Sequence, residues 1–475
     1  MTNTDSWETK YSRIARSLIE RIKSGEFPPG TKLPSLRRIC LSEQCNLSTA
    51  VEAFGILQEQ GYIRGRERSG YFILPRAENP SKFKVDKPVR ISNPSVPEEV
   101  GSLLAELADP AFISFGAAVP DDRFLPLASL ERCYRSAMRD PFLHKYSDVQ
   151  GHPELRRKIS NQASVKERRI SPEQVFVTVG CSEAAFVCLS LLTKAGDEVA
   201  VESPLHFVLY QILSILKLKA VEIPTDPASG MDLKSYEYVL KTSKPKLLIT
   251  VPTFSNPTGS LMSAESKKEL LRLSVKYGVR ILEDDIYGEL SHSPGPRPPS
   301  LLSLDGTREF VIQVSSLSKT VSPGLRIGWL IGDPELIHKA VQRRIAESIA
   351  LPSLPQLAAA NFLGSLGYER HIRNLKRNIG NSVISYTDAL LDCFPKGTTL
   401  SVPKGGFLLW VELPEGKDSR ELRTRAVKKR ISLVPGNLFS LSGKYQRNFR
   451  INAGIPFGPS VSSAIRTLGR IAGEI

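Results

Sequence analysis

A series of short apolar stretches, each separated from the next by helix-like sequence, constrains the fold more than any other feature of this chain. The stretches follow one another through the C-terminal part, at 174–179, 198–203, 246–252, 279–283 and 310–314. Apolar runs that alternate with amphipathic segments are typical of an α/β fold with a mainly parallel sheet. We therefore expect residues 98–475 to form one α/β domain.

The last apolar stretch leads into Ser315–Trp329, where Lys319 is followed seven residues later by Arg326. A lysine that leaves a strand end into a pocket can lose its proton through desolvation and form a Schiff base with an aldehyde. An arginine nearby offers a planar fork for a phosphate group. Pyridoxal phosphate is an aldehyde cofactor that carries its own phosphate. Taken alone, the pair is equally compatible with a surface lysine beside a structural arginine.

Polar residues follow the other apolar stretches too. The stretch 174–179 leads into Gly180-Cys181-Ser182 and a helix, and such a turn can bind phosphate with its backbone N–H groups. The amide of Asn256 could donate to a phenolate oxygen. Asp284 ends a buried strand, and with Tyr287 it could hold a pyridinium nitrogen and a ring hydroxyl, which would make the ring an electron sink. Singly, a helix-capping aspartate and a core tyrosine remain reasonable alternatives.

Residues 1–76 have a different pattern, which predicts three helices followed by a β-hairpin. The first helix covers 7–22, the second opens at Ser35 and the third begins at Asn46, both of them good N-cap residues. Two short helices joined by a tight turn form a helix-turn-helix, whose second helix enters the major groove of DNA. The segment 62–74 predicts a hairpin with arginines near its turn, able to reach phosphates or the minor groove.

A segment of about twenty residues, 77–97, is rich in proline and has no hydrophobic periodicity. It is interpreted as an extended, solvated linker. Fully stretched, it would span roughly 70 Å, enough for the first domain to lie against a neighbouring subunit.

Charge and cysteine content narrow the cellular setting. The formal net charge of +15 suits a polyanionic partner but does not require one. No apolar run reaches the length of about 18 residues that a membrane helix needs, and no signal-peptide pattern opens the chain. The six cysteines are scattered without a C-x-x-C pair. This favours a reduced, cytoplasmic location and argues against a disulfide framework or a metal site.

The N-terminal segment resembles the GntR-type winged helix-turn-helix of bacterial repressors, from YSRIARSLIERIKSGEFPPGTKLPSLRR to GYIRGRERSGYFI. The resemblance implies contacts with double-stranded DNA from one helix start, the next helix start and the wing tip: Arg37, Asn46, Leu47, Ser48, Thr49, Arg68 and Gly70. The family often has Ser-Arg-x-Thr where this chain has Asn-Leu-Ser-Thr. That departure puts guanine readout in doubt, while Leu47 could contact a thymine methyl group.

The C-terminal segment resembles the fold-type I pyridoxal-phosphate aminotransferases. The motifs N-P-T-G, D-D-x-Y and S-x-S-K-x-x-x-P-G-x-R-x-G-W occur in that order. The resemblance implies that Lys319 forms the Schiff base with pyridoxal phosphate and that Asp284 pairs with the pyridine nitrogen. It implies that Asn256 and Tyr287 bind the ring oxygen. The implied phosphate ligands are Arg326, Ser316, Ser318 and the backbone of Cys181 and Ser182.

Three further roles follow from the same resemblance. Tyr146 matches a tyrosine that completes the phosphate site of the other subunit, which implies a homodimer. Arg450, in NFRINAG, matches the arginine that receives a substrate α-carboxylate. His206 stands where the family usually has a tyrosine that stacks on the cofactor ring, so reactivity could differ from that of a working transaminase.

Together the two segments resemble the MocR-like regulators, which join a GntR-type reader to an aminotransferase-like body. The resemblance implies a DNA-binding transcriptional regulator that senses an amine, an amino acid or vitamin B6 status through pyridoxal phosphate. Net turnover is not expected, although a residual transaminase half-reaction is possible. The alternative is an active aminotransferase with an accessory DNA-binding domain.

Overall fold

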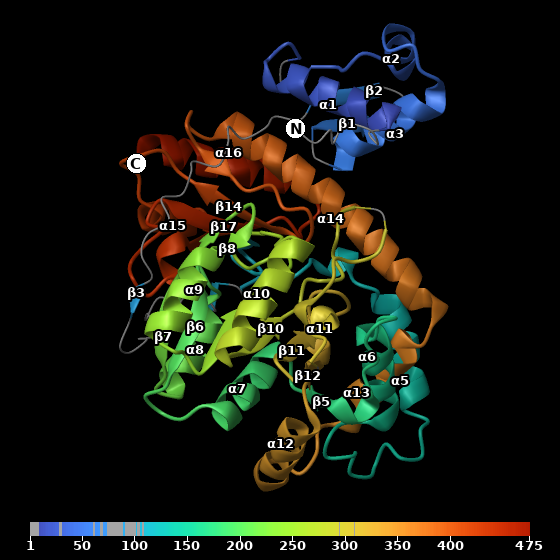
Figure 1. The fold of residues 1–475 in the computed structure, drawn as a ribbon, viewed down its shortest axis with the longest axis vertical. Coiled ribbons are helices and arrows are strands. Elements are labelled where there is room, and N and C mark those ends of the chain that lie inside the picture. Colours follow the sequence, from blue (N-terminus) through green and yellow to red (C-terminus); the bar gives the residue numbers. More distant parts are fainter. Residues whose placement is uncertain are drawn as a thin grey trace, which may run out of the picture. The chain divides into compact units, whose positions relative to one another are not determined.

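In the computed structural model the chain divides into two compact units, Met1–Ser81 and Lys82–Ile475 (Figure 1). The structure describes residues 9–27, 31–59, 62–66, 70–73, 89–90, 101, 105–106, 109–293, 295–307 and 309–475.

The described residues of the small unit form three helices and an antiparallel hairpin, as predicted. Its elements are α1 (Lys10–Lys23), α2 (Leu36–Ser42), α3 (Leu47–Glu59), β1 (Ile63–Arg66) and β2 (Gly70–Ile73). The hairpin pairs Ile63 with Ile73, and the backbone N–H of Leu33 donates to the carbonyl of Tyr71 at 2.8 Å, which ties the segment before α2 to the wing. Phe54 of α3 is fully buried in the shared apolar core. The small unit therefore has a core of its own.

Both expected N-caps of the helix-turn-helix are formed. The Ser35 hydroxyl accepts a hydrogen bond from the backbone N–H of Arg38 at 3.3 Å at the start of α2. The side-chain oxygen of Asn46 accepts one from the N–H of Thr49 at 2.8 Å at the start of α3. These bonds satisfy N–H groups that have no partner within the helix, and they explain why the two helices begin where they do.

The large unit is organised around a nine-stranded sheet in the order β3-β7-β6-β9-β10-β11-β12-β5, with β8 attached to β7. The strands β7, β6, β9, β10 and β11 are parallel, while β12 is antiparallel to both of its neighbours. The mainly parallel sheet predicted from the alternating pattern is thus confirmed. The bounds are β3 (Val89–Arg90), β5 (Val175–Thr178), β6 (Glu198–Ser203), β7 (Lys219–Asp226), β8 (Gly230–Met231), β9 (Leu247–Thr250), β10 (Arg280–Asp284), β11 (Val311–Ser316) and β12 (Gly328–Ile331).

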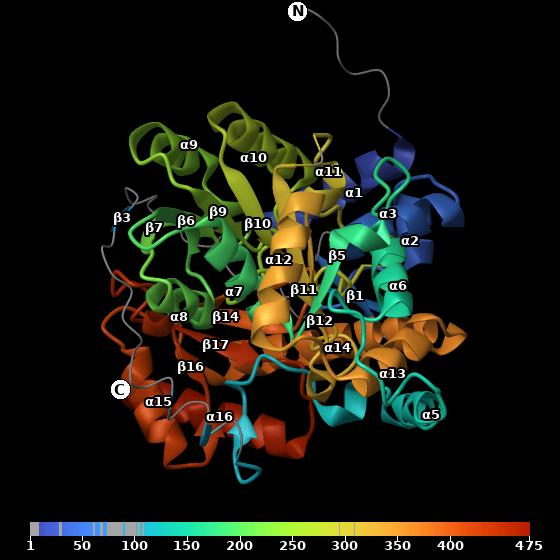
Figure 2. The same cartoon turned by 90° about the horizontal axis from the view of Figure 1, so that it is seen from below.

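Helices cover both faces of this sheet (Figure 2). Val199 and Val201 of β6 belong to the apolar cluster shared with α7 (Cys181–Leu192), α8 (Phe207–Ile215) and α12 (Pro334–Glu347). Ala200, between them, belongs to the cluster shared with α9 (Leu233–Thr242) and α10 (Ala264–Tyr277). Successive strand residues point to opposite faces, so a strand buried on both sides must be apolar throughout. The remaining helices of this part are α5 (Leu127–Ala137), α6 (Pro153–Ala163), α11 (Leu301–Leu304) and α13 (Ser353–Leu363).

The C-terminal part forms a second, smaller layer. Its antiparallel sheet has the order β13-β14-β17-β16, and a short parallel pair joins β15 to β4. An apolar cluster containing Tyr386 of the long helix α14 and Leu468 of α16 packs against Phe449 of β17. Among the described residues, no helix combines the length and apolarity needed to cross a membrane. The elements are β4 (Ile113–Ser114), α14 (Leu366–Cys393), β13 (Thr399–Leu400), β14 (Leu408–Glu412), α15 (Ser419–Val427), β15 (Ile431–Ser432), β16 (Val434–Pro435), β17 (Asn448–Asn452) and α16 (Pro459–Glu474).

Part of the expected linker, 77–97, joins the large sheet. Val89 and Arg90 form β3 and pair antiparallel with Glu222 and Val221 of β7. The other residues of that segment lie outside the described residues. The added strand covers the edge of β7, whose unpaired N–H and C=O groups would otherwise be open to unwanted pairing. The segment therefore contributes to the sheet as well as connecting the two units.

Candidate cofactor site and DNA-binding surface

The polar residues predicted from the strand ends gather at the carboxyl edge of the large sheet. Asp284 ends β10, Lys319 follows the end of β11, and His206 follows the end of β6. The β10–β11 pairing brings Asp284 opposite Val314, five residues before Lys319. In open α/β sheets, ligands bind outside the carboxyl ends of the strands. The sheet topology therefore assembles the site from segments far apart in sequence.

Lys319 lies in the turn after β11, close to several charged groups. Burial lowers its pKa to about 8, and the positive charges of Arg450 and Arg326 act in the same direction, while the nearby Asp284 opposes them. A lysine with a pKa near 8 has a larger neutral fraction at physiological pH than an exposed lysine, and only the neutral amine is a nucleophile. The environment of Lys319 thus suits attack on a carbonyl group.

Asp284 is the acidic partner in the same cluster. Its Oδ1 accepts from the backbone N–H of Ile286 at 3.2 Å and from the Cys181 thiol at 3.7 Å. Burial raises the pKa of Asp284 to about 6. A buried carboxylate in this position is stabilised by a cation, and a protonated pyridine nitrogen supplies one. The donor set therefore fits the ring nitrogen of pyridoxal phosphate.

The turn between β5 and α7 forms an anion cradle next to Arg326. Gly180 has φ +84°, and a Cβ at this position would lie 2.6 Å from Nη2 of Arg326. A Cβ at Gly328 would lie 2.3 Å from the carbonyl carbon of Gly180. The two glycines therefore let β12 and the guanidinium approach the start of α7, where the N–H groups of Cys181 and Ser182 are free of helix partners. A helix N-terminus beside an arginine suits a phosphate group.

Ser316 and Ser318, the other predicted phosphate ligands, are both buried. The hydroxyl of Ser316 accepts a hydrogen bond from the N–H of Ser318 at 3.2 Å. Arg326 has a left-handed backbone, with φ +51°, and its Nη2 donates to the carbonyl of Val179 at 2.9 Å. Arg326 is thus held directly against the turn that precedes α7.

Arg450 is the most buried of the predicted ligands, at 1% exposure. Its Nη1 donates to Oδ1 of Asn256 at 2.7 Å and its Nη2 donates to the carbonyl of Gly116 at 2.6 Å. Its Nε has no hydrogen-bond partner, and no described carboxylate forms an ion pair with it. Burial lowers the pKa of Arg450 to about 10. A buried guanidinium without a carboxylate partner is suited to an anionic ligand.

Asn256 and Tyr287 lie together, as the two predicted ligands of a ring oxygen should. Because the Asn256 carbonyl oxygen accepts from Arg450, its amide N–H groups remain to donate. Tyr287 is fully buried and hydrogen-bonded to Asn256, and burial raises the pKa of its hydroxyl. Tyr287 therefore stays protonated and can donate to an oxyanion.

His206 and Tyr146 are placed differently from the rest. The ring of His206 lies 4.6 Å from that of Phe207, and burial, followed by the charges of Arg450 and Lys319, lowers its pKa well below the usual value. His206 is therefore a neutral imidazole that can present a flat face. Tyr146 is 83% exposed and is not gathered with the other residues within one chain. Its role in a partner's site stays a prediction.

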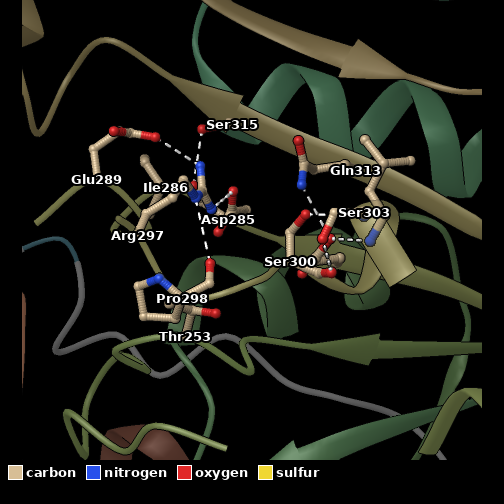
Figure 3. Close-up of polar contacts among 12 residues, drawn as sticks. Thr253, Asp285, Ile286, Glu289, Arg297, Pro298, Ser300, Ser303, Gln313 and Ser315 are labelled. Atoms are coloured by element: carbon tan, nitrogen blue, oxygen red, sulfur yellow. Dashed lines mark hydrogen bonds and ion pairs between the residues drawn. The ribbon is translucent and has the colours of Figure 1, made fainter. Parts of the chain in front are cut away.

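Glu283 and Asp285, the sequence neighbours of Asp284, belong to a buried polar network that was not anticipated from the sequence; Figure 3 shows its Asp285, Arg297 and Gln313 side chains. Arg297 donates to Asp285 Oδ2 at 2.5 Å and to Glu289 at 2.8 Å. Glu283 accepts from the N–H groups of Leu301 and Leu302 at 2.7 and 3.0 Å and from Gln313 at 3.0 Å. The run Glu-Asp-Asp at 283–285 was the available signal, since successive side chains of a strand covered on both faces point into the protein, where acids need partners.

This network stabilises the strand end that carries Asp284. The hydroxyl of Ser315 donates to the carbonyl of Asp285 at 3.1 Å and so links β11 to the same point (Figure 3). Lys267, fully buried on α10, donates to Thr253 at 2.6 Å and to the carbonyl of Pro299 at 2.8 Å. Within the described ranges, no three histidines, cysteines or acidic residues are grouped as a metal site would require.

On the small unit, the predicted DNA contacts fall on two exposed helix starts and the wing. Arg37 of α2 and Leu47 of α3 are exposed, with 57% of Leu47 accessible. The side chains of Asn46 and Ser48 are partly used within the N-cap of α3, because the Ser48 hydroxyl donates at 2.9 Å to the Asn46 oxygen that caps the helix. Thr49 supplies only its backbone N–H to that cap.

The structure describes both strands of the wing, up to Arg66 before the tip and from Gly70 after it. Gly70 has φ +91°, and a Cβ there would meet the side chain of Lys32 at 2.7 Å, so glycine allows the strand to cross this lysine closely. Arg68, the predicted tip contact, lies outside the described residues.

Comparisons with known proteins agree with the division of the chain into a small and a large unit. The model of the family "Bacterial regulatory proteins, gntR family" matches residues 10–73, and that of "Aminotransferase class I and II" matches residues 126–456. The chain is therefore a DNA-binding regulator built from a helix-turn-helix domain and an aminotransferase-like domain. More specifically, it belongs to the MocR-like fusions of a GntR reader with an aminotransferase class I and II body.

Two relatives share this whole arrangement. The Escherichia coli (strain K12) protein named "Uncharacterized HTH-type transcriptional regulator YdcR" is 31% identical over 467 residues, covering 98% of this chain and 99% of the relative. The protein of the same strain named YjiR, with the same description, is 32% identical, covering 97% and 98%. The similarity thus runs through both units and the segment between them.

Aminotransferases resemble the large unit alone. The 2-aminoadipate transaminase of Thermus thermophilus is 28% identical over 375 residues, covering 78% of this chain and 92% of the enzyme. The structure of LysN, an α-aminoadipate aminotransferase of Thermus thermophilus, complexed with N-(5'-phosphopyridoxyl)-L-leucine, has a TM-score of 0.74 and 27% identity, covering 80% of this chain and 95% of LysN. The relationship to pyridoxal-phosphate proteins is therefore one of sequence as well as fold.

Proposed function

We propose that this protein is a transcriptional regulator whose large unit binds pyridoxal phosphate and uses it to sense an amine, an amino acid or vitamin B6 status. The observation that carries the proposal is the convergence of Lys319, Asp284 and the buried Arg450 in one cluster of charged groups, in a chain that also has a winged helix-turn-helix. Bound there, the cofactor would supply an aldehyde able to capture amines reversibly.

Each group of the chain has a distinct part in holding the cofactor. Lys319 supplies the amine for the covalent link, and Asp284 supplies the negative charge that keeps the ring nitrogen protonated. Asn256 and Tyr287 donate to the ring oxygen. The start of α7, Arg326, Ser316 at the end of β11 and Ser318 just after it would hold the phosphate. His206 would stack on the ring as a neutral group, so it would add no charge.

Arg450 would determine what the site senses. We expect its buried guanidinium to bind the carboxylate of an amino acid, and its charge acts on Lys319, the residue with which the amino group would compete for the aldehyde. The site would then favour amino acids over simple amines, because an amine leaves Arg450 without an anionic partner. When no ligand is present, Asn256 and the carbonyl of Gly116 satisfy part of the guanidinium.

For ligand binding to regulate transcription, it must favour one DNA-binding geometry over another. A homodimer provides a route, because two helix-turn-helix units would meet two half-sites whose spacing depends on the arrangement of the large units. The exposure of Tyr146 supports a dimer in which this tyrosine completes the partner's phosphate site.

A second candidate function is an aminotransferase with an accessory DNA reader. It is favoured by the completeness of the residue set, since lysine, aspartate, the phosphate ligands and the carboxylate-binding arginine are all present. His206 stands in place of the expected tyrosine, and this favours the first candidate function, a regulator that senses a ligand without net turnover.

DNA footprinting tests the proposal directly. The full-length protein is bound to DNA upstream of its own coding sequence, with and without pyridoxal phosphate and with a panel of amines and amino acids. We expect one ligand class to change the affinity or the protected pattern only when cofactor is present. A Lys319→Ala protein is the control and should bind DNA without responding. Steady conversion of an amino acid and a ketoacid over many turnovers, with no ligand effect on DNA, would instead establish the enzyme.

A further inference from the structure

The recognition helix α3 presents an exposed apolar pair to solvent. Leu47 is 57% exposed and Val51 is 48% exposed, and residues four apart lie on the same helix face. The core of the small unit is built from the opposite face, where Ala50, Phe54 and Leu57 are fully buried. Leu47 and Val51 therefore take no part in the core and are available to a partner.

The same helix has no side chain of the type that reads guanine. Residues Leu47–Glu59 include neither lysine nor arginine. Two of the three polar side chains at its start, Asn46 and Ser48, are hydrogen-bonded to each other at 2.9 Å within the cap, while the third, Thr49, gives the cap only its backbone N–H. Apolar side chains therefore form a large part of the surface that the first turns of α3 offer to the bases, beside the hydroxyl of Thr49.

The surroundings of the pair favour DNA as the partner that covers it. Arg37 and Arg38 at the start of α2 are exposed and form no ion pair within the part of the chain that the structure describes. They can neutralise phosphates, and the first turn of α3 contains no acidic residue to oppose them. A protein partner would cover an apolar pair equally well, but it would not account for the adjoining exposed arginines.

We propose that Leu47 and Val51 read the C5-methyl groups of thymines in the major groove, so that thymines define the operator half-site at the positions facing α3. The major groove presents a methyl group at each thymine, and apolar side chains contact it, whereas cytosine has hydrogen at the same place. The proposal rests on DNA binding by the small unit and specifies what that unit recognises.

The test begins by selecting bound sequences from a random duplex library with the full-length protein. Each thymine of the selected half-site is then replaced, one at a time, by deoxyuridine, which removes only the methyl group. We expect affinity to fall about fourfold at the contacted positions, the factor expected for one buried carbon group.

The variants assign each methyl group to a side chain. In Leu47→Ala the uridine effect should vanish at one position, and in Val51→Ala at another. Leu41→Ala is the matched control, because Leu41 is 81% exposed but lies on α2, and it should retain both effects. Because all three side chains are exposed, thermal unfolding should be unchanged, and this is measured alongside.

The possible failures are distinguishable. Three results would overturn the proposal while leaving DNA binding intact. The selected half-sites could contain no thymine, or the uridine duplexes could bind as tightly as the thymine duplexes. The third such result is a uridine effect that is equal in the wild type and in both α3 variants. If the protein binds no duplex at all, the DNA-binding premise fails and the proposal fails with it.

Discussion

The candidate DNA-binding face of the small unit and the candidate cofactor site of the large unit differ most in burial. Arg37 is exposed, whereas Arg450 is 1% exposed and hydrogen-bonded on two sides. An exposed group can be replaced with little effect on folding, while a buried charged group supports the structure around it. Function and stability should therefore separate in the small unit and be coupled in the large one.

The largest expected effect comes from Lys319→Ala. Without the amine, no covalent link to pyridoxal phosphate forms, so the absorbance band of the bound cofactor and the mass increase after borohydride reduction should both disappear. DNA binding in the absence of ligand should remain, because the small unit has its own core. Loss of both properties would show that the units do not function separately.

Arg450→Gln should strongly weaken the response to amino acids. Removing one partner of a buried charged pair costs about 2–5 kcal/mol, so the ligand concentration for half-maximal effect should rise at least about thirtyfold. An amine that lacks a carboxylate serves as the control, and its half-maximal concentration should change little. Titration followed by absorbance measures both. A similar loss for amine and amino acid would mean that Arg450 supports the fold rather than binding the carboxylate.

The pKa of Lys319 predicts the pH dependence of cofactor capture. Because its pKa is lowered to about 8, the neutral fraction rises about tenfold per pH unit below 8 and levels off above it. The rate at which cofactor-free protein gains the absorbance band should follow this curve. A profile that keeps rising to about pH 10 would indicate an ordinary exposed amine and would contradict the site environment.

Arg37→Ala should weaken DNA binding by about fivefold and leave the cofactor band unchanged. Since the side chain is exposed, the free energy of unfolding should change by less than about 0.5 kcal/mol. Electrophoretic mobility shifts and thermal unfolding test the two statements. A large drop in stability would remove the contrast between the two units.

The smallest effects are expected at Asn46. Its side chain has both a capping role and a predicted DNA contact, and two substitutions can separate these roles. Asn46→Ala should destabilise the small unit by about 1 kcal/mol through loss of the cap. Asn46→Asp keeps the capping oxygen, so stability should be retained while a contact through the amide would be lost. Chemical unfolding and DNA affinity of the two variants separate the roles. If Asn46→Asp binds DNA as tightly as the wild type, Asn46 acts only as a cap.

Patterns that act locally were enough to predict much of this protein. The caps at Ser35 and Asn46 depend on side chains two or three residues from the groups they satisfy, so they are visible in a short window of sequence. The apolar runs of the large unit predicted a parallel sheet for a similar reason, because burial on both faces requires uninterrupted apolar residues. The expected linker was different, since pairing of Val89 and Arg90 with β7 depends on a strand more than a hundred residues away.

By itself, the sequence determined the two-part architecture, the element types and the residues with the chemistry to bind a phosphate-bearing aldehyde. The tertiary structure alone decided their environment: Lys319 acquires its lowered pKa from burial and from Arg450, which is more than a hundred residues away in the chain. It also decided which polar side chains at the start of α3 are used by the cap and which apolar ones remain exposed. Charge, burial and hydrogen bonding depend on distances in space, and these exist only once the chain has folded.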